Sequence, residues 1–99
     1  MPKESDISDI SFNNEREAFV YIIGSKKSGK KYSYVGWTYD IKNRLEAHNK
    51  GTGAKSTKGK YWKLLYFETF PNKFMAQSRE WYLKRDHGFR AKIKQLHLT

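Results

Sequence analysis

The sequence predicts an α/β fold in which a small, mainly antiparallel three-stranded sheet is flanked by helices in the order β-β-α-β-α. Three aromatic-rich apolar runs, at 19–23, 32–38 and 64–70, have the composition and length of strands. Two further segments, 41–49 and 73–85, follow residues that commonly begin helices. The 99 residues suit one domain, because domains usually contain roughly 100–150 residues.

The first two strands are expected to form a hairpin. The run 19–23 is apolar throughout, which is typical of a strand covered on both faces. Residues 24–31 contain two Gly, two Ser and four Lys, which predicts a long basic hairpin tip before the second strand at 32–38. The third strand, at 64–70, follows a loop rich in Gly, Ser and Thr.

The first helix is expected from Ile41 to about Asn49. Asp40 is a natural N-cap, because its carboxylate can accept from the free backbone N–H groups of the first turn. Gly51 is a plausible stop, since glycine adopts the left-handed conformation that often ends a helix. Ile41 and Leu45 are spaced i, i+4 and form the stripe that faces the core.

The second helix is expected from about Lys73 to Arg85. Pro71 and Asn72 end the third strand and open this helix. A final short helix is expected from Arg90 to Leu96.

The charge is strongly positive and unevenly distributed. Twenty Lys and Arg oppose ten Asp and Glu, which gives a net charge of +10 and favours a polyanionic partner, nucleic acid before an anionic membrane. Residues 1–17 hold two basic and five acidic side chains, whereas residues 18–99 hold 18 basic and five acidic ones. We therefore expect a flexible acidic N-terminal arm at 1–17 and a basic domain at 18–99.

Several classes of protein are excluded by composition. Without cysteine, the chain has no disulfide framework, no thiolate zinc site and no cysteine nucleophile. The longest apolar run, 19–23, is far shorter than the roughly 20 residues of a membrane span. The acidic N-terminus does not resemble a signal peptide, so an intracellular protein of cytoplasm or nucleus is expected, of eukaryotic, bacterial or viral origin.

Glu80 differs from the other four carboxylates of the basic domain. It lies four residues after Ala76 and three before Leu83, so it shares their helical face and is expected to be partly buried. A partly buried carboxylate is explained by an ion pair with a Lys or Arg, or by a metal ion at a phosphodiester. The sequence leaves both interpretations open.

Two further pairs of polar side chains are each expected to share a face. Arg44 and His48 are spaced i, i+4 and share a face beside the apolar stripe of the first helix. Tyr21 and Tyr34 lie in neighbouring strands, where both phenols can emerge on one side of the sheet. A solvated helix face and ordinary core packing are the alternatives.

A basic loop with interleaved aromatic residues covers positions 50–63. Its side chains suit phosphate contacts and stacking on bases or sugars. In the alternative interpretation it is a solvated Lys-rich loop in which Trp62 anchors the next strand. The residues expected to contact DNA, in this loop and elsewhere, are Lys30, Lys31, Lys42, Lys55, Lys58, Lys60 and Trp62.

These residues together resemble the GIY-YIG endonuclease family. The half-motifs are Val20-Tyr21-Ile22 and Tyr34-Val35-Gly36, followed by Arg44, His48 and Glu80 in family order. The resemblance covers about residues 18–86 and looks nearest to the catalytic domain of the eukaryotic structure-selective flap and Holliday-junction nuclease and its small single-domain relatives.

The resemblance implies a DNA endonuclease of repair or recombination that uses one divalent ion, Mg²⁺ with Mn²⁺ as a substitute, held by Glu80. It implies that Tyr21 and Tyr34 bind and deprotonate the attacking water, one of them as general base. Arg44 would stabilise charge on the phosphate and His48 would orient the water or relay a proton. The implied substrate is branched or distorted DNA, cut to 5′-phosphate and 3′-hydroxyl ends, and a regulatory or targeting protein is a possible partner.

The sequence departs from the family pattern at three places. The first half-motif lacks its leading glycine, and Trp37 stands where many members have a lysine, so Lys30, Lys31 or Lys42 would have to assist the tyrosine. No asparagine follows Glu80. The competing functions are a non-catalytic nucleic-acid-binding module and a basic structural or ribosome-associated protein.

Overall fold

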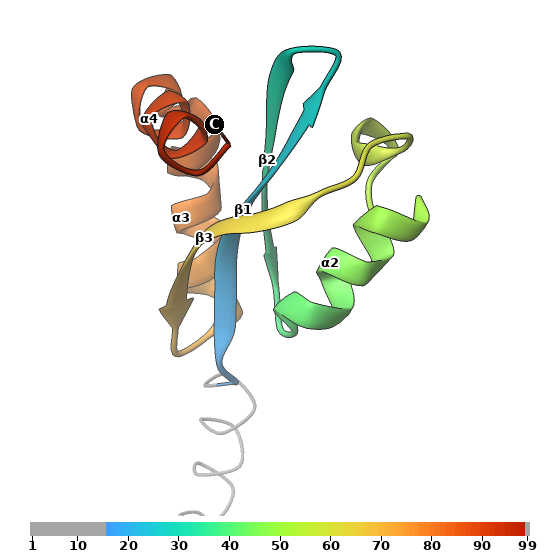
Figure 1. Ribbon diagram of the computed structural model, residues 1–99. Coiled ribbons are helices and arrows are strands. Elements are labelled where there is room, and N and C mark those ends of the chain that lie inside the picture. Colours follow the sequence, from blue (N-terminus) through green and yellow to red (C-terminus); the bar gives the residue numbers. More distant parts are fainter. Residues whose placement is uncertain (1–15, 99) are drawn as a thin grey trace, which may run out of the picture.

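The computed structural model describes residues 16–98, which form a three-stranded sheet with helices on both faces (Figure 1). The strands are β1 (Ala18–Lys27), β2 (Lys30–Thr38) and β3 (Lys63–Phe70). β1 lies in the centre and pairs antiparallel with β2 and with β3. This confirms the predicted α/β class. Of the arm predicted at 1–17, residues 1–15 lie outside the described part of the chain.

The hairpin between β1 and β2 is longer than the sequence predicts. The strands pair as far as Lys27 opposite Lys30, so the long tip expected at 24–31 is wrong. Ser28 and Gly29 alone make the turn, with φ of 55° and 81°. Positive φ at both central residues matches the twist of the paired strands, which allows the ladder to continue up to a two-residue turn.

The helices begin where the sequence predicts capping. α2 (Ile41–Lys50) starts at Asp40, whose Oδ1 accepts from the backbone N–H of Asn43 at 3.0 Å. It ends at Gly51, which has φ of 81°. α3 (Lys73–Arg85) starts at Asn72, whose side chain accepts from Met75 N–H at 3.0 Å.

The last helix, α4 (His87–His97), is longer than the segment Arg90–Leu96 expected from the sequence. Asp86 accepts from the backbone N–H of Phe89 at 3.0 Å, and so caps the new helix three residues early. A short 3₁₀ turn, η1 (Lys55–Thr57), interrupts the basic loop between α2 and β3.

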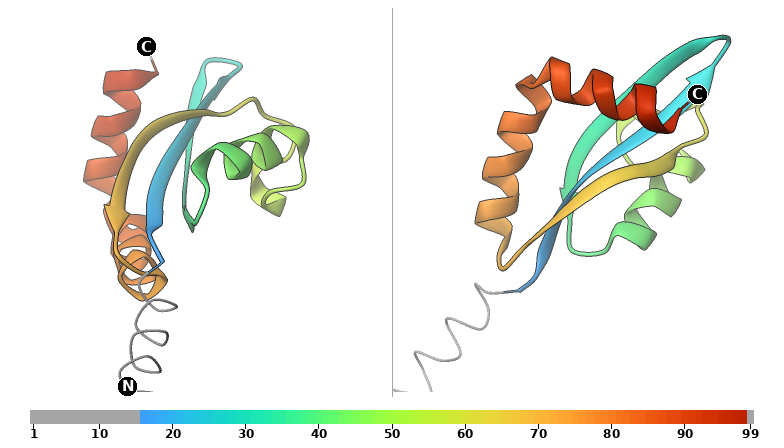
Figure 2. Two further views of the ribbon diagram at one scale, coloured as in Figure 1. Left: turned by 90° about the horizontal axis from the view of Figure 1, so that it is seen from below. Right: turned by 60° about the vertical axis from the view of Figure 1, so that its left-hand side comes forward.

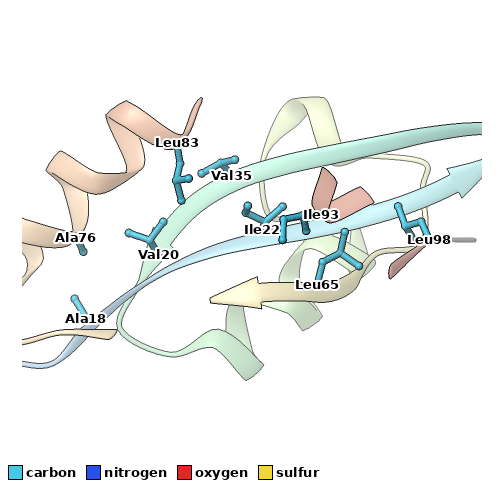
Figure 3. Close-up of a cluster of buried hydrophobic side chains, with 9 residues drawn as sticks. All are labelled: Ala18, Val20, Ile22, Val35, Leu65, Ala76, Leu83, Ile93 and Leu98. Atoms are coloured by element: carbon cyan, nitrogen blue, oxygen red, sulfur yellow. The ribbon is translucent and has the colours of Figure 1, made fainter. Parts of the chain in front are cut away.

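The helices divide between the two faces of the sheet. α2 covers one face, and α3 and α4 cover the other (Figure 2). Alternate residues of β1 enter two cores, because side chains alternate along a strand. The core under α3 and α4 consists of nine buried residues, shown in Figure 3: Ala18, Val20, Ile22, Val35, Leu65, Ala76, Leu83, Ile93 and Leu98.

The second core lies between the sheet and α2. Tyr21, Ile23 and Trp62 are buried there, and Ile41 and Leu45 pack against them, as their spacing predicts. Both faces of β1 are therefore covered, which confirms the interpretation of its continuous apolar run.

Candidate active site

Tyr21 and Tyr34 both lie on the face of the sheet that α2 covers. Their rings are 6.4 Å apart, and Tyr21 is buried. The Tyr21 phenol crosses β2 above Gly36, where a Cβ atom would stand only 2.5 Å from Tyr21 Oη. The glycine of the second half-motif thus makes room for the tyrosine of the first.

A chain of hydrogen bonds runs from Tyr21 through His48 to Thr57. Tyr21 Oη lies 2.8 Å from His48 Nε2, and His48 Nδ1 lies 2.9 Å from Thr57 Oγ1. Thr57 donates its one hydroxyl proton to the carbonyl of Ala54 at 2.8 Å, so it accepts from His48 Nδ1–H. His48 Nε2 is then the acceptor, and Tyr21 donates to it.

Thr57 is the site residue that the sequence does not single out. It is fully buried in η1, and its carbonyl accepts from the indole Nε1 of Trp62 at 2.8 Å. The short-range signal available is a threonine three residues after Ala54, where a hydroxyl can close a turn. The contact with His48 depends on the fold and has no local signature.

Trp62 is a core residue. Its side chain is 2% exposed, which leaves no ring face for a base, so the prediction that it contacts DNA is wrong. The alternative, that Trp62 anchors the next strand, is supported by its place in the core under α2.

Gly53 packs directly on His48, and Gly53→Ala is expected to destabilise the protein. A Cβ at this position would lie 2.5 Å from His48 Nδ1 and 2.9 Å from its Cα, which is too close for a methyl carbon. Overpacking of this kind typically costs about 1–3 kcal/mol of unfolding free energy. Urea denaturation measures this loss of unfolding free energy. Gly88→Ala is a suitable control, since a Cβ there is unobstructed. Gly59→Ala is unsuitable, because Gly59 has φ of 81°. Equal stability of Gly53→Ala and wild type would contradict the packing.

Burial keeps the Tyr21–His48 pair uncharged. It raises the pKa of Tyr21 to about 12, the Arg44 guanidinium opposes this shift, and the charges of Tyr34 and Glu80 add to it. Burial, with a smaller contribution from the positive charge of Arg44, lowers the pKa of His48 to about 4. At neutral pH the phenol therefore keeps its proton and the imidazole accepts from it.

His48 is expected to weaken the fold as the pH falls. In the unfolded chain a histidine takes up a proton near pH 6.5, whereas in the folded protein the pKa of His48 is about 4. The contribution of neutral His48 is thus complete above pH 6.5 and is lost as the pH falls toward 4, by about 3 kcal/mol in total. The unfolding free energy is measured by urea denaturation at about pH 7 and at about pH 4.5. Between these two pH values, wild type should lose about 2 kcal/mol more of it than His48→Gln does. Equal losses in the two proteins would contradict the shift.

The charges of Arg44 on α2 and Glu80 on α3 both act on the pKa of Tyr21, in opposite directions. Arg44 projects from the inner side of α2, close enough to act on the pKa of both Tyr21 and His48. Glu80 lies on α3 next to Arg79, whose Nε and Nη2 donate to Glu68 of β3 at 2.9 and 3.0 Å. Hydrogen bonding, ring packing and charge thus connect the five residues of the predicted set through Tyr21 and His48.

Glu80 has the exposure and surroundings of a single carboxylate ligand. Its side chain is 20% exposed, and its Oε2 lies 3.5 Å from Nζ of Lys84. This contact is the ion pair that the structural alternative predicts. It contributes little stability, because the lysine is half-exposed. Within residues 16–98 no three His, Asp or Glu side chains converge on a metal position. The donor set fits Mg²⁺, which binds through one or two carboxylates and otherwise keeps water and phosphate ligands.

The lysines expected to meet DNA lie on β2, on α2 and in the loop between α2 and β3. Lys60 is half-buried, with its ammonium 4.6 Å from the Tyr32 ring centroid, and Lys27 donates to the Gly59 carbonyl at 3.0 Å. These contacts attach the basic loop to the hairpin. The other predicted lysines are exposed: Lys30, Lys31, Lys42, Lys55 and Lys58.

The GIY-YIG catalytic domain model matches residues 17–94. The chain belongs to the GIY-YIG family. The match covers β1 to α4, and so includes both half-motif tyrosines and the helix that carries Glu80. No solved structure matches this GIY-YIG chain.

Curated relatives of this GIY-YIG chain are bacterial. A UPF0213 protein of Clostridium perfringens is 48% identical over 68 residues, which cover 68% of this chain and 70% of the relative. A UPF0213 protein of Pediococcus pentosaceus is 47% identical over 53 residues, or 52% and 56% of the two chains. A UPF0213 protein of Streptococcus pyogenes serotype M5 is 38% identical over 71 residues, or 71% and 74%. The family prediction is confirmed, and these relatives do not single out the eukaryotic flap and junction nuclease.

In the described residues of this GIY-YIG domain, no helix has the length and apolar character needed to cross a bilayer.

Proposed function

We propose that this GIY-YIG protein is a metal-dependent endonuclease that hydrolyses DNA phosphodiester bonds and prefers branched or distorted DNA. The observation that carries the proposal is the hydrogen-bonded chain from Tyr21 through His48 to Thr57, on which the charges of Arg44 and Glu80 act. A buried phenol bonded to a neutral imidazole can pass on a proton, which hydrolysis requires and phosphate binding does not.

Tyr21, and not Tyr34, is the general base in this proposal. Tyr21 is the tyrosine that donates to His48 Nε2, while the Tyr34 ring packs against the imidazole at a centroid distance of 4.9 Å. As the attacking water gives its proton to Tyr21 Oη, the phenolic proton passes to His48 Nε2. The water oxygen bonds to phosphorus, the bond from phosphorus to the 3′-oxygen breaks, and the leaving 3′-oxygen takes a proton from solvent water.

Thr57 fixes the direction of this transfer. Because it accepts from His48 Nδ1–H, the imidazole keeps Nε2 free to receive the phenolic proton. In the free protein the transfer is unfavourable, since the pKa of Tyr21 is about 12 and that of His48 about 4. A bound phosphate favours the imidazolium, because its negative charge offsets the positive charge of Arg44.

Arg44 and Glu80 act on the phosphate. The forked donors of Arg44 suit the charge that develops on the phosphate oxygens during attack. Glu80, with water and the DNA, would hold Mg²⁺ or Mn²⁺, which supplies Lewis-acid stabilisation of that charge when bound.

The exposed lysines predicted to contact DNA favour recognition of DNA shape over base sequence. Its exposed DNA-facing residues are mainly lysines, which contact phosphates and carry no base-sequence information. Selectivity among DNAs must then come from geometry and flexibility. The motif resemblance to the eukaryotic flap and junction nuclease supports the same preference.

The test is cleavage of 5′-labelled flap, four-way-junction and linear duplex DNA by the wild-type chain with Mg²⁺, with Mn²⁺ and with EDTA. We expect cutting of the branched substrates with either metal, slower cutting of linear duplex, and none with EDTA. Binding without cutting under every condition would favour the non-catalytic binding module. Cutting that persists in EDTA would contradict the metal dependence.

A further inference from the structure

The outer side of α3 exposes an aromatic surface that neither core uses. Phe74 is 58% exposed, Trp81 50% and Tyr82 61%, while Ala76 and Leu83 on the inner side are buried. A shallow pocket lies between the exposed rings. Its lining, here called the α3 aromatic surface, consists of Phe74, Gln77, Ser78, Trp81 and Tyr82.

Cations lie against two rings of this surface. The Arg85 guanidinium carbon stands 3.7 Å from the Trp81 ring centroid, and Arg85 Nη1 donates to the Trp81 carbonyl at 2.9 Å. Lys73 Nζ lies 5.3 Å from the Phe74 ring centroid. Tyr82 meets the Trp81 ring edge-on at 5.0 Å. The surface therefore offers flat rings and a flat guanidinium together with positive charge.

Charge decides which partner suits these rings. α3 carries four basic side chains against one acidic one, and the acidic one is Glu80. An apolar protein partner would have to remove water from Arg85 and Lys73 without compensation. A nucleic acid strand with unpaired bases supplies both planar faces for stacking and phosphates for the cations.

Position links the surface to the cleavage centre. Glu80 and Trp81 are consecutive, so they project about 100° apart around the helix axis, a little over a quarter turn. Phe74 lies seven residues before Trp81, two turns or roughly 10 Å along the axis. A strand with a phosphate at Glu80 can continue around α3 onto these rings.

We propose that the α3 aromatic surface binds an unpaired segment of DNA by stacking its bases on Trp81, Arg85 and Phe74. This inference rests on the proposed function in one respect, because it makes the unpaired arm of a branched substrate the part that is recognised. Gln77 and Ser78, between the rings, add hydrogen-bonding groups that fit bases of any sequence.

The test measures binding of the full chain to labelled single-stranded DNA and to a duplex of equal length in EDTA, so that no cleavage is required. We expect Trp81→Ala with Phe74→Ala to weaken single-strand binding roughly tenfold or more and duplex binding less than about twofold. Trp81→Phe keeps a ring and should stay within about threefold of wild type. Leu96→Ala, an exposed apolar residue on α4, is the control and should bind like wild type.

Three outcomes would overturn the inference. Unchanged single-strand binding by the double variant would show that bases do not stack on this surface. Equal losses of affinity for single strand and duplex would show that the surface binds DNA without preference for unpaired bases. A wild-type dimer that the double variant converts to a monomer, with DNA binding retained, would assign the surface to self-association. Failure of the proposed function appears separately, as wild-type binding of the single strand without metal-dependent cutting of any substrate.

Discussion

Glu80→Gln is expected to lower the single-turnover rate of DNA cleavage roughly a thousandfold. This corresponds to a loss of several kcal/mol of transition-state stabilisation. The amide keeps the volume of the side chain and removes the charge that would hold a hard divalent cation. DNA binding in EDTA should persist or tighten, because one negative charge near the phosphate path is lost. The assay is cutting of 5′-labelled flap DNA in excess enzyme, with binding measured in parallel.

Glu46→Gln is the matched control for this variant. Glu46 is an exposed carboxylate on the outer side of α2, and the same chemical change there should leave the cleavage rate within about twofold of wild type. Glu80→Gln should also keep the stability of the fold, because Lys84, the ion-pair partner that it loses, is half-exposed. Cutting by Glu80→Gln at near the wild-type rate would refute the metal-ligand role of this residue.

Tyr21→Phe is expected to reduce the cleavage rate by roughly 10²–10⁴-fold, the range typical of a lost general base. The ring remains to fill the core under α2, while the hydroxyl that bonds to His48 Nε2 is removed. The same loss leaves His48 Nε2 without its buried partner, which costs about 1–3 kcal/mol of unfolding free energy. Both quantities come from one preparation, by flap cleavage and by urea denaturation.

Tyr34→Phe provides the comparison that assigns the base. Its ring packs on His48 and its hydroxyl is not the one bonded to the imidazole, so the variant should cut at least about tenfold faster than Tyr21→Phe. The reverse order of rates would give the role of general base to Tyr34.

Much of the fold could be predicted because its signals are local. Asp40, Gly51 and Asn72 mark helix ends through their own backbone chemistry, and the structure places the helix boundaries at them. The hairpin tip could not be placed from composition. Its Gly, Ser and Lys are typical of loops, yet Ser28 and Gly29 alone reverse the chain and the lysines continue the ladder.

The candidate site was predictable in part. Helical spacing brings Arg44 and His48 together, and strand pairing places Tyr21 beside Gly36, so these residues could be grouped from sequence. Thr57 could not, because its bond to His48 requires the loop after α2 to fold back on the helix, where Gly53 allows close approach. Trp62 shows the opposite error: its surroundings in sequence are basic, but its ring is in the core.

The proposed function requires that this chain hydrolyse a DNA phosphodiester by attack of water on phosphorus, with loss of the 3′-oxygen. Cleavage of flap DNA by the wild-type chain with Mg²⁺ in water labelled with heavy oxygen, followed by mass spectrometry of the new ends, tests it most directly. Attack of water on phosphorus should leave labelled oxygen in the 5′-phosphate of each cut end and an unlabelled 3′-hydroxyl. Label at the 3′ end, or no cleavage at all, would contradict it.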